Sequence, residues 1–189
     1  MRFLLLVVIV MSFTILSCDG RDKRYKSNRE ILQEQNLLES FSKSITYIPE
    51  AYIKTSKDTI LSNGYRVKIE SYTDMKNSYL KTSVKNNIQH IHYYRQIKSI
   101  IKISKQNKDI LTMPVTKDNL IAKNWSLSKT LENKIIKGIW LDEYNSNMQN
   151  KVVIDILFYE PETKNTVYCS LSFDEEGQLF INDKLKEIS

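Results

Sequence analysis

Residues 152–159 have the sequence VVIDILFY, and residues 166–173 have the sequence TVYCSLSF. The first segment is nearly continuous in apolar residues, broken only by Asp155, which is typical of a central strand. The second segment alternates, and its inward face is expected to carry Val167, Cys169, Leu171 and Phe173. A turn at residues 161–165 joins the two segments, so they predict an antiparallel hairpin with one buried face.

More strands are expected on both sides of this hairpin. Residues 135–144 precede it, with a loop at residues 145–147, and residues 178–182 follow it after an acidic turn at residues 174–177. Towards the N-terminus, Asn63-Gly64 predicts a tight hairpin that opens on an alternating strand from Tyr65 to Ile69.

The middle of the chain is rich in β-branched residues, which favours strands over helices. Strands are predicted at residues 79–84, 88–104 and 110–115, and the last is expected at a sheet edge because Pro114 cannot donate a backbone hydrogen bond. Residues 116–131 are expected to hold one or two short helices, with Asp118 as a cap.

A helix is predicted over residues 29–45, capped by Asn28 and ended before Pro49. Its apolar residues follow a helical spacing. Together these elements predict a sheet-rich α+β fold in which an N-terminal helix packs on a mainly antiparallel sheet. A sandwich and a half-barrel are both compatible with the pattern.

The first eighteen residues have the organisation of an export signal. Arg2 is followed by an apolar run over residues 3–15, which is shorter than the roughly 20 apolar residues of a membrane-spanning helix. The run ends in Ile15-Leu16-Ser17-Cys18. An uncleaved anchor helix and an ordinary signal peptide with a chance cysteine are the alternatives.

The sequence Ile15-Leu16-Ser17-Cys18 resembles the lipobox of bacterial lipoproteins, although Leu16 is bulkier than the usual residue there. The resemblance implies cleavage between Ser17 and Cys18, a diacylglycerol thioether on Cys18, and an N-acyl chain such as palmitate on the new amine. It predicts a signal peptide at residues 1–17, a lipidated tether at 18–28 and one globular domain at 29–189. Two or three acyl chains anchor firmly, since each buried methylene contributes about 0.8 kcal/mol.

These expectations define the compartment and the partners. The chain is expected in the bacterial cell envelope, lipid-anchored and facing the periplasm, with the choice of inner or outer membrane left open. Its formal net charge is +6, and basic residues crowd the tether, where they would attract anionic lipid or simply be solvated. Nucleic acid is not an expected partner in this compartment. If Cys18 carries lipid, Cys169 has no disulfide partner and is expected as a small buried apolar residue.

The mature part also resembles, in its general pattern, a domain-of-unknown-function family of small secreted lipoproteins of Bacteroidetes-type bacteria. The shared features are the lipobox, the short tether, the helix, a charged strand pair from Arg95 to Ile110 and a closing hairpin from Val152 to Ile181. The resemblance implies no activity and supplies no functional residues.

Candidate residues for chemistry are few. His90 and His92 should lie on one face of a strand, where they could share a metal if a neighbouring strand supplied a third ligand; two half-exposed sheet histidines are the expected alternative. Tyr93 and Tyr94 are binding candidates in a chain with eleven tyrosines. No nucleophile-elbow serine motif or phosphate-binding glycine loop is present, and the acidic clusters Asp142-Glu143 and Asp174-Glu175-Glu176 suit solvated residues at a strand end and in a turn.

Three functional hypotheses follow from the sequence. The first is a non-enzymatic binding or interaction module for an envelope protein or a small ligand, with no cofactor and no metal. The second is a hydrolase that depends on carboxylates or histidines, and the third is an inhibitory or immunity-type periplasmic lipoprotein. The sequence favours the first because it carries no catalytic motif.

Overall fold

The structure is a computed structural model that describes residues 26–188. Cys18, Ser17, the predicted signal peptide and most of the predicted tether lie outside these residues. The chain divides into two compact units. Within the described range, the smaller unit comprises residues 26–44 and 84–89, and the larger unit comprises residues 45–83 and 90–188.

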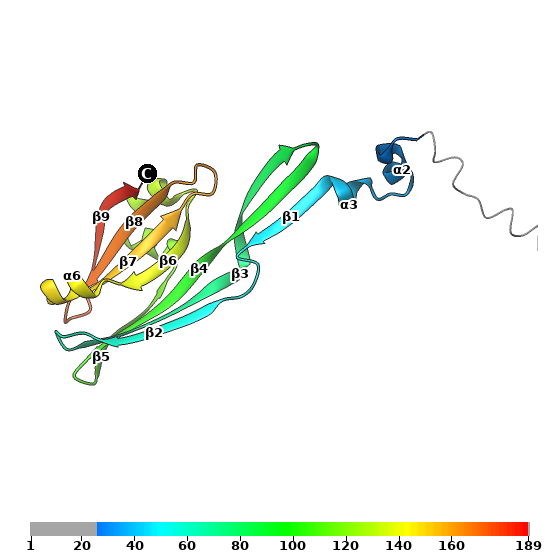
Figure 1. Ribbon diagram of the computed structural model, residues 1–189. Helices are drawn as coiled ribbons and strands as arrows, with labels where there is room; N and C mark the ends of the chain where they lie inside the picture. Colours follow the sequence, from blue (N-terminus) through cyan, green and yellow to red (C-terminus); the bar gives the residue numbers. More distant parts are fainter. Residues whose placement is uncertain (1–25, 189) are drawn as a thin grey trace, which may run out of the picture. The chain divides into compact units, whose positions relative to one another are not determined.

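The first sheet, called sheet A, has five strands (Figure 1): β1 (Lys43–Ile48), β2 (Lys54–Ile60), β3 (Tyr65–Lys85), β4 (Ile88–Lys105) and β5 (Lys108–Val115). Their order is β1-β4-β3-β2, and β5 also pairs with β4. The β2–β3 hairpin closes at Asn63-Gly64 as predicted, because Gly64 adopts a φ of 86° that few other residues tolerate. Pro114 lies on β5, an edge strand, which confirms that expectation.

The second sheet, called sheet B, is an antiparallel meander with the order β6-β7-β8-β9. Its strands are β6 (Ile135–Leu141), β7 (Val152–Tyr159), β8 (Thr166–Phe173) and β9 (Leu179–Ile188). In β8 buried and half-buried residues alternate strictly, so the predicted period of two is confirmed. Cys169 is fully buried, also as predicted.

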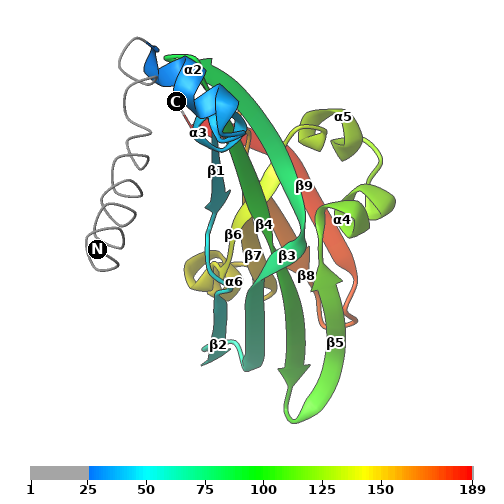
Figure 2. The same cartoon turned by 90° about the vertical axis from the view of Figure 1, so that its right-hand side faces the viewer.

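Three short helices accompany the sheets: α4 (Lys117–Lys123), α5 (Leu127–Leu131) and α6 (Glu143–Met148). The helices α4 and α5 follow β5 and lie next to each other (Figure 2). Thr116, not Asp118, caps α4, because its side chain accepts a hydrogen bond from the Asn119 amide. The predicted loop at residues 145–147 is wrong: Asp142 ends the strand region by capping α6.

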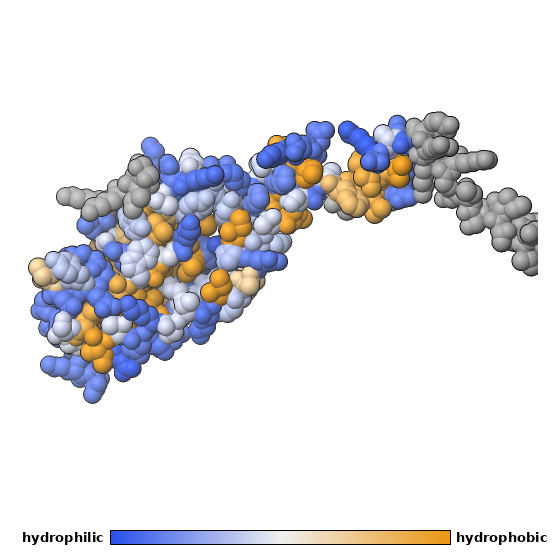
Figure 3. Space-filling view, viewed as in Figure 1, coloured by the Kyte–Doolittle hydropathy of each residue, from blue (hydrophilic) through white to orange (hydrophobic). Residues whose placement is uncertain are grey.

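The smaller unit contains α2 (Asn28–Glu34), α3 (Leu38–Ser42) and the tip of the β3–β4 hairpin. Ser27 caps α2 in a capping box with Glu30, one residue before the predicted cap. Apolar side chains of the smaller unit, including the exposed Phe41 and Val84, line an open groove of about 630 Å³. Part of this hydrophobic surface is visible over α3 in Figure 3.

The single helix predicted over residues 29–45 is therefore wrong. Asn36 adopts a φ of 56°, which stops a right-handed helix between α2 and α3. From residue 43 the chain joins sheet A as β1, where the β-branched Ile45, Thr46 and Ile48 suit an extended backbone.

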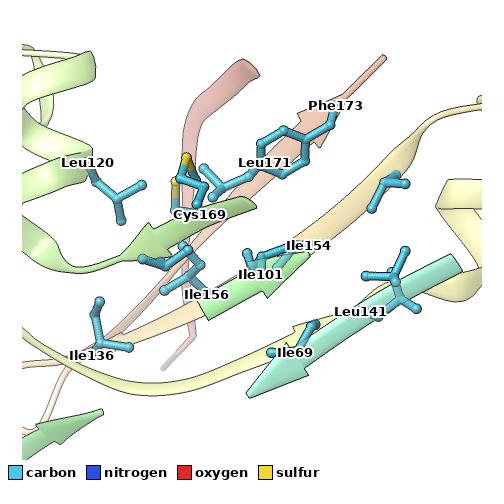
Figure 4. Close-up of a cluster of buried hydrophobic side chains, with 14 of the residues drawn as sticks. Ile69, Ile101, Leu120, Ile136, Leu141, Ile154, Ile156, Cys169, Leu171 and Phe173 are labelled. Carbon is cyan, nitrogen blue, oxygen red and sulfur yellow. The ribbon is translucent and has the colours of Figure 1, made fainter. Parts of the chain in front are cut away.

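One hydrophobic core is shared by both sheets of the larger unit. Figure 4 shows side chains of β3 and β4 meeting those of β6, β7 and β8, with Leu120 of α4 beside them. The core-facing helices are α4 and α5, which bury Leu120, Leu127 and Leu131, whereas α2 has no buried residue. The helical share of the core thus comes from residues 117–131, not from the N-terminal helix.

The predicted fold class is confirmed: the described chain is sheet-rich α+β with two mainly antiparallel sheets that do not close into a barrel. The separate strand predicted at residues 79–84 is instead the continuation of β3, which runs unbroken for 21 residues. None of the helices within residues 26–188 combines the length and apolar character that crossing a membrane requires.

Candidate functional site

The predicted histidines lie on one face of β4, as their spacing indicates. The rings of His90 and His92 stack with centroids 6.3 Å apart, and Tyr94 continues the row at 6.2 Å. Tyr94 then contacts Tyr159 of β7, whose ring has the Lys137 ammonium 4.6 Å from its centroid. The row therefore joins sheet A to sheet B, which gives these side chains a packing role.

A metal ion at this row would lack a third ligand among the described residues. No group of three or more His, Cys, Asp or Glu side chains in residues 26–188 is arranged to hold an ion. The Nδ1 atom of His92 is buried and has no hydrogen-bond partner in the described structure. The two histidines are thus brought together, but the third ligand that the metal hypothesis requires is not.

Tyr93 points to the opposite face of β4 from Tyr94. Its ring stacks on Tyr47 of β1 with centroids 4.9 Å apart. The Arg95 guanidinium lies 4.4 Å from the centroid of the same Tyr47 ring and donates hydrogen bonds to the Pro49 and Glu50 carbonyls. These contacts fasten β1 and the turn after it to β4, so Tyr93 is largely committed within the fold.

A second, more polar site lies on the face of sheet B opposite the core. A cavity of about 520 Å³ is lined there by side chains from β7, β8 and β9: Asp155, Tyr168, Ser170, Ser172 and Asn182. These residues alternate with the buried ones along their strands, so the period of two that builds the core also builds this outer pocket.

The centre of the outer pocket follows the strand register. Trp140 of β6 is opposite Asp155, Asp155 is opposite Ser170, and Ser170 is opposite Asn182. The Ser170 hydroxyl donates to Asp155 Oδ1 at 2.6 Å. One cross-strand row thus carries an indole, a carboxylate, a hydroxyl and an amide on the same face.

The helix α6 forms one end of the outer pocket through Asp142, Asn145 and Gln149. Asp142 accepts hydrogen bonds from the backbone N–H of Asn145 and from Asn145 Nδ2, so both of its carboxylate oxygens are occupied. Ser146 is fully buried and accepts from the Val153 amide at 2.8 Å, which fixes α6 to β7. The rim of the pocket is therefore held by hydrogen bonds.

Gly138 and Tyr168 position the Trp140 ring beside this pocket. The Tyr168 and Trp140 rings pack edge to face, with centroids 5.6 Å apart. A Cβ atom at Gly138 would lie 3.2 Å from Trp140 Cζ3, closer than ordinary van der Waals contact, so the glycine gives the indole room to lie over its own strand. Trp140 nevertheless keeps 36% of its surface exposed.

An ion pair in sheet A, between the buried Asp74 and the half-buried Lys98, lies apart from this pocket and has a structural role. Asp74 is 5% exposed, and its carboxylate contacts Lys98 Nζ at 2.8 Å and accepts from Asn77 and from two backbone amides. Burial alone would raise the pKa of Asp74, but these hydrogen bonds outweigh it and hold the pKa well below its ordinary value. The same contact raises the pKa of Lys98.

Sequence reasoning did not single out Trp140, Asp155 or Ser170. One signal was available, namely a lone carboxylate in an otherwise apolar central strand, because such a residue needs an outward face or a partner.

A scan against protein-family models found no match, and a search of curated proteins also found none.

Proposed function

We propose that this chain is a lipid-anchored bacterial envelope protein whose folded part is a non-enzymatic binding module. The outer pocket of sheet B carries the binding half of the proposal, because fixed polar groups line it on a rigid sheet and the part-exposed indole of Trp140 lies beside it, opposite Asp155. The anchoring half rests on Ile15-Leu16-Ser17-Cys18, with the lipid on Cys18.

The tether length supports this arrangement. Asn28, where α2 begins, is ten residues after Cys18, so the first helix could lie no more than about 36 Å from the lipid site even on a fully extended chain. The basic residues Arg21, Lys23 and Arg24 fall in this interval and would favour an anionic lipid surface.

The anchor is tested by intact mass and membrane partitioning of the protein from its native host, beside a Cys18→Ala variant. The proposal expects a mature chain starting at residue 18 with a diacyl or triacyl mass, found with membranes. The variant should lack that mass and leave the membrane fraction. An unlipidated soluble product or an uncleaved precursor of the unaltered chain would overturn the anchoring half.

A hydrolase is less well supported by the pocket. Asp142 and Asp155 both line it, but the Asp142 carboxylate caps α6 with both oxygens. Asp155 has one oxygen engaged by Ser170. A general acid and a general base each need a carboxylate that can reach the substrate, so this pair suits binding better than hydrolysis.

An inhibitory role is the second candidate, and one observation favours it. β1 is an edge strand, and its Ile45, Tyr47 and Ile48 are each at least 40% exposed. An edge strand with apolar side chains can pair with a strand of a partner protein. If this edge binds a partner, Ile45→Lys should abolish the complex in size-exclusion chromatography, whereas Trp140→Ala should leave it intact.

A further inference from the structure

The outer pocket of sheet B has features that select a class of ligand, and this inference rests on the binding module proposed above. We propose that the pocket and the indole beside it bind a neutral saccharide, with one sugar ring stacked on Trp140 and its hydroxyl groups bonded to Asp155 and the neighbouring amides.

The platform is built into the sheet. The indole of Trp140 is confined by Tyr168 on one side and can lie over its strand because Gly138 has no side chain. A half-exposed ring in a fixed orientation offers a flat surface with a partial negative charge. The polarised C–H groups on one face of a pyranose ring are attracted to such a surface, and little side-chain entropy is lost on binding because the ring is already held.

The polar groups lie where hydroxyl groups of a stacked sugar would reach them. Asp155 is directly opposite Trp140 in the sheet register, and one of its oxygens, Oδ2, accepts no hydrogen bond from the described residues. Asn145 and Gln149 add amide groups at the α6 end of the cavity. A carboxylate accepts from two adjacent hydroxyls and an amide both donates and accepts, so this set matches the vicinal hydroxyls of a sugar.

The charge of the lining argues against other small ligands. Among the described side chains that line the cavity, none belongs to Lys, Arg or His, so an anion would find no opposite charge. A metal ion is disfavoured because residues 26–188 contain no group of three or more His, Cys, Asp or Glu side chains placed to hold one. An ammonium ligand would be expected to favour several aromatic faces, but here the Tyr168 and Trp140 rings pack against each other edge to face, with their planes at 77°.

The size of the cavity fits one or two sugar rings. Its volume of about 520 Å³ falls within the range of about 300–1,000 Å³ typical of small-molecule sites. Because the pocket lies on the surface of a sheet, a longer glycan could extend beyond it in either direction. An internal or terminal unit of an envelope polysaccharide is therefore the kind of ligand that this surface would accept.

Tryptophan fluorescence can test the assignment directly. The chain has two tryptophans, and Trp125 is 77% exposed outside the pocket, so Trp125→Phe leaves Trp140 as the sole reporter. The full chain, in a detergent without a sugar headgroup, would be titrated with maltose, lactose, cellobiose, mannobiose and chitobiose. Choline and phosphate would be titrated in parallel as a cation and an anion.

A saturable change with at least one disaccharide is expected, with dissociation constants between about 0.01 and 10 mM, as for open sites with few contacts. Asp155→Asn should weaken that binding at least about tenfold, as expected for a lost charge-assisted hydrogen bond. Gly138→Ala should weaken it as well, although Trp140 is still present. Tyr93→Phe on sheet A is the matched control and should leave binding unchanged.

Three results would overturn the saccharide assignment: no saturation with any disaccharide, saturation that Asp155→Asn and Gly138→Ala leave untouched, or saturation with choline or phosphate instead. Circular dichroism of each variant separates lost binding from lost folding. Choline or phosphate binding at Trp140 would exclude the saccharide but keep the binding module. The lipid anchor is tested independently by the mass of the Cys18 species.

Discussion

In β8 every second residue is buried and the others are half-buried, whereas residues 88–98 of β4 are half-buried on both faces. The two strands are built from similar residues, with many β-branched and aromatic side chains. What differs is their surroundings, since β8 has the core on one side and the outer pocket on the other. A single buried face leaves the opposite face available for polar, functional side chains.

The largest expected effect tests the buried side of this contrast. Ile156 is fully buried in sheet B, so Ile156→Ala should lower the free energy of unfolding by about 2–5 kcal/mol through lost burial and a residual cavity. Leu80 of β3 is 53% exposed, so Leu80→Ala should change the free energy of unfolding by less than about 0.5 kcal/mol. Chemical denaturation monitored by circular dichroism measures both. Equal losses would mean that the extension of β3 and β4, namely residues 75–85 and 88–98, is part of the core.

The sequence predicts sheet B well and sheet A less well for the same reason. A strand that packs on one face must alternate, and residues 166–173 do so visibly. The extension of β3 and β4 has no such constraint, which is why one 21-residue strand was predicted as two separate pieces. The helix over residues 29–45 fails because Asn36 adopts a left-handed conformation that spacing does not reveal.

The spacing of residues along the sequence shows which side chains share a face of a strand, but not which strands become neighbours. His90 and His92 were expected on one face of a strand and are, but whether a third ligand approaches depends on strand order. The Trp140–Asp155–Ser170 row unites three strands whose register is fixed only after folding. The role of Gly138 likewise depends on the position of the Trp140 ring, which the sequence alone does not show.

A second prediction concerns the ion pair of Asp74 and Lys98, where β3 and β4 leave the core. Asp74→Asn should destabilise the protein by about 1–3 kcal/mol at neutral pH, because Lys98 then loses its charged partner. The folded-state pKa of Asp74 is lowered, so its contribution is present above the unfolded value of about 3.9 and is lost as pH falls below it.

Denaturation curves measured at several pH values test whether the stability contributed by Asp74 falls on acidification. The stability difference between the two proteins should be constant from neutral pH down to about pH 5 and should shrink below about pH 4. The exposed pair of Asp58 and Arg66 provides the control, and Asp58→Asn should have a much smaller effect. A difference that grows on acidification would contradict the assignment.

A smaller effect is expected at Tyr65, which is fully buried on β3. Its hydroxyl group has no hydrogen-bond partner in the described structure, although Lys105 Nζ lies 4.5 Å from the ring centroid. Removing an unsatisfied polar atom costs no hydrogen bond, so Tyr65→Phe should leave stability within about 0.5 kcal/mol or raise it slightly. A loss above about 1 kcal/mol in thermal unfolding would mean that the hydroxyl is bonded.

The smallest effect is predicted at the histidine row of β4. Addition of Zn²⁺ should not raise the melting temperature, because a third ligand is lacking among the described residues near His90 and His92. A saturable rise that His92→Ala removes would establish a metal site and strengthen the enzyme hypothesis. His90→Ala should then have the same effect, which separates a shared ion from nonspecific binding.

Amide hydrogen exchange of the full chain, followed by mass spectrometry with and without a disaccharide that Trp140 detects, tests the central contrast most directly. Amides of β7 and β8 should exchange only through global unfolding, while those of residues 76–82 and 91–97 exchange faster through local opening. The ligand should slow exchange mainly in β6, α6 and the strands around Asp155. Uniform protection along both sheets, or protection by the ligand confined to sheet A, would contradict the account.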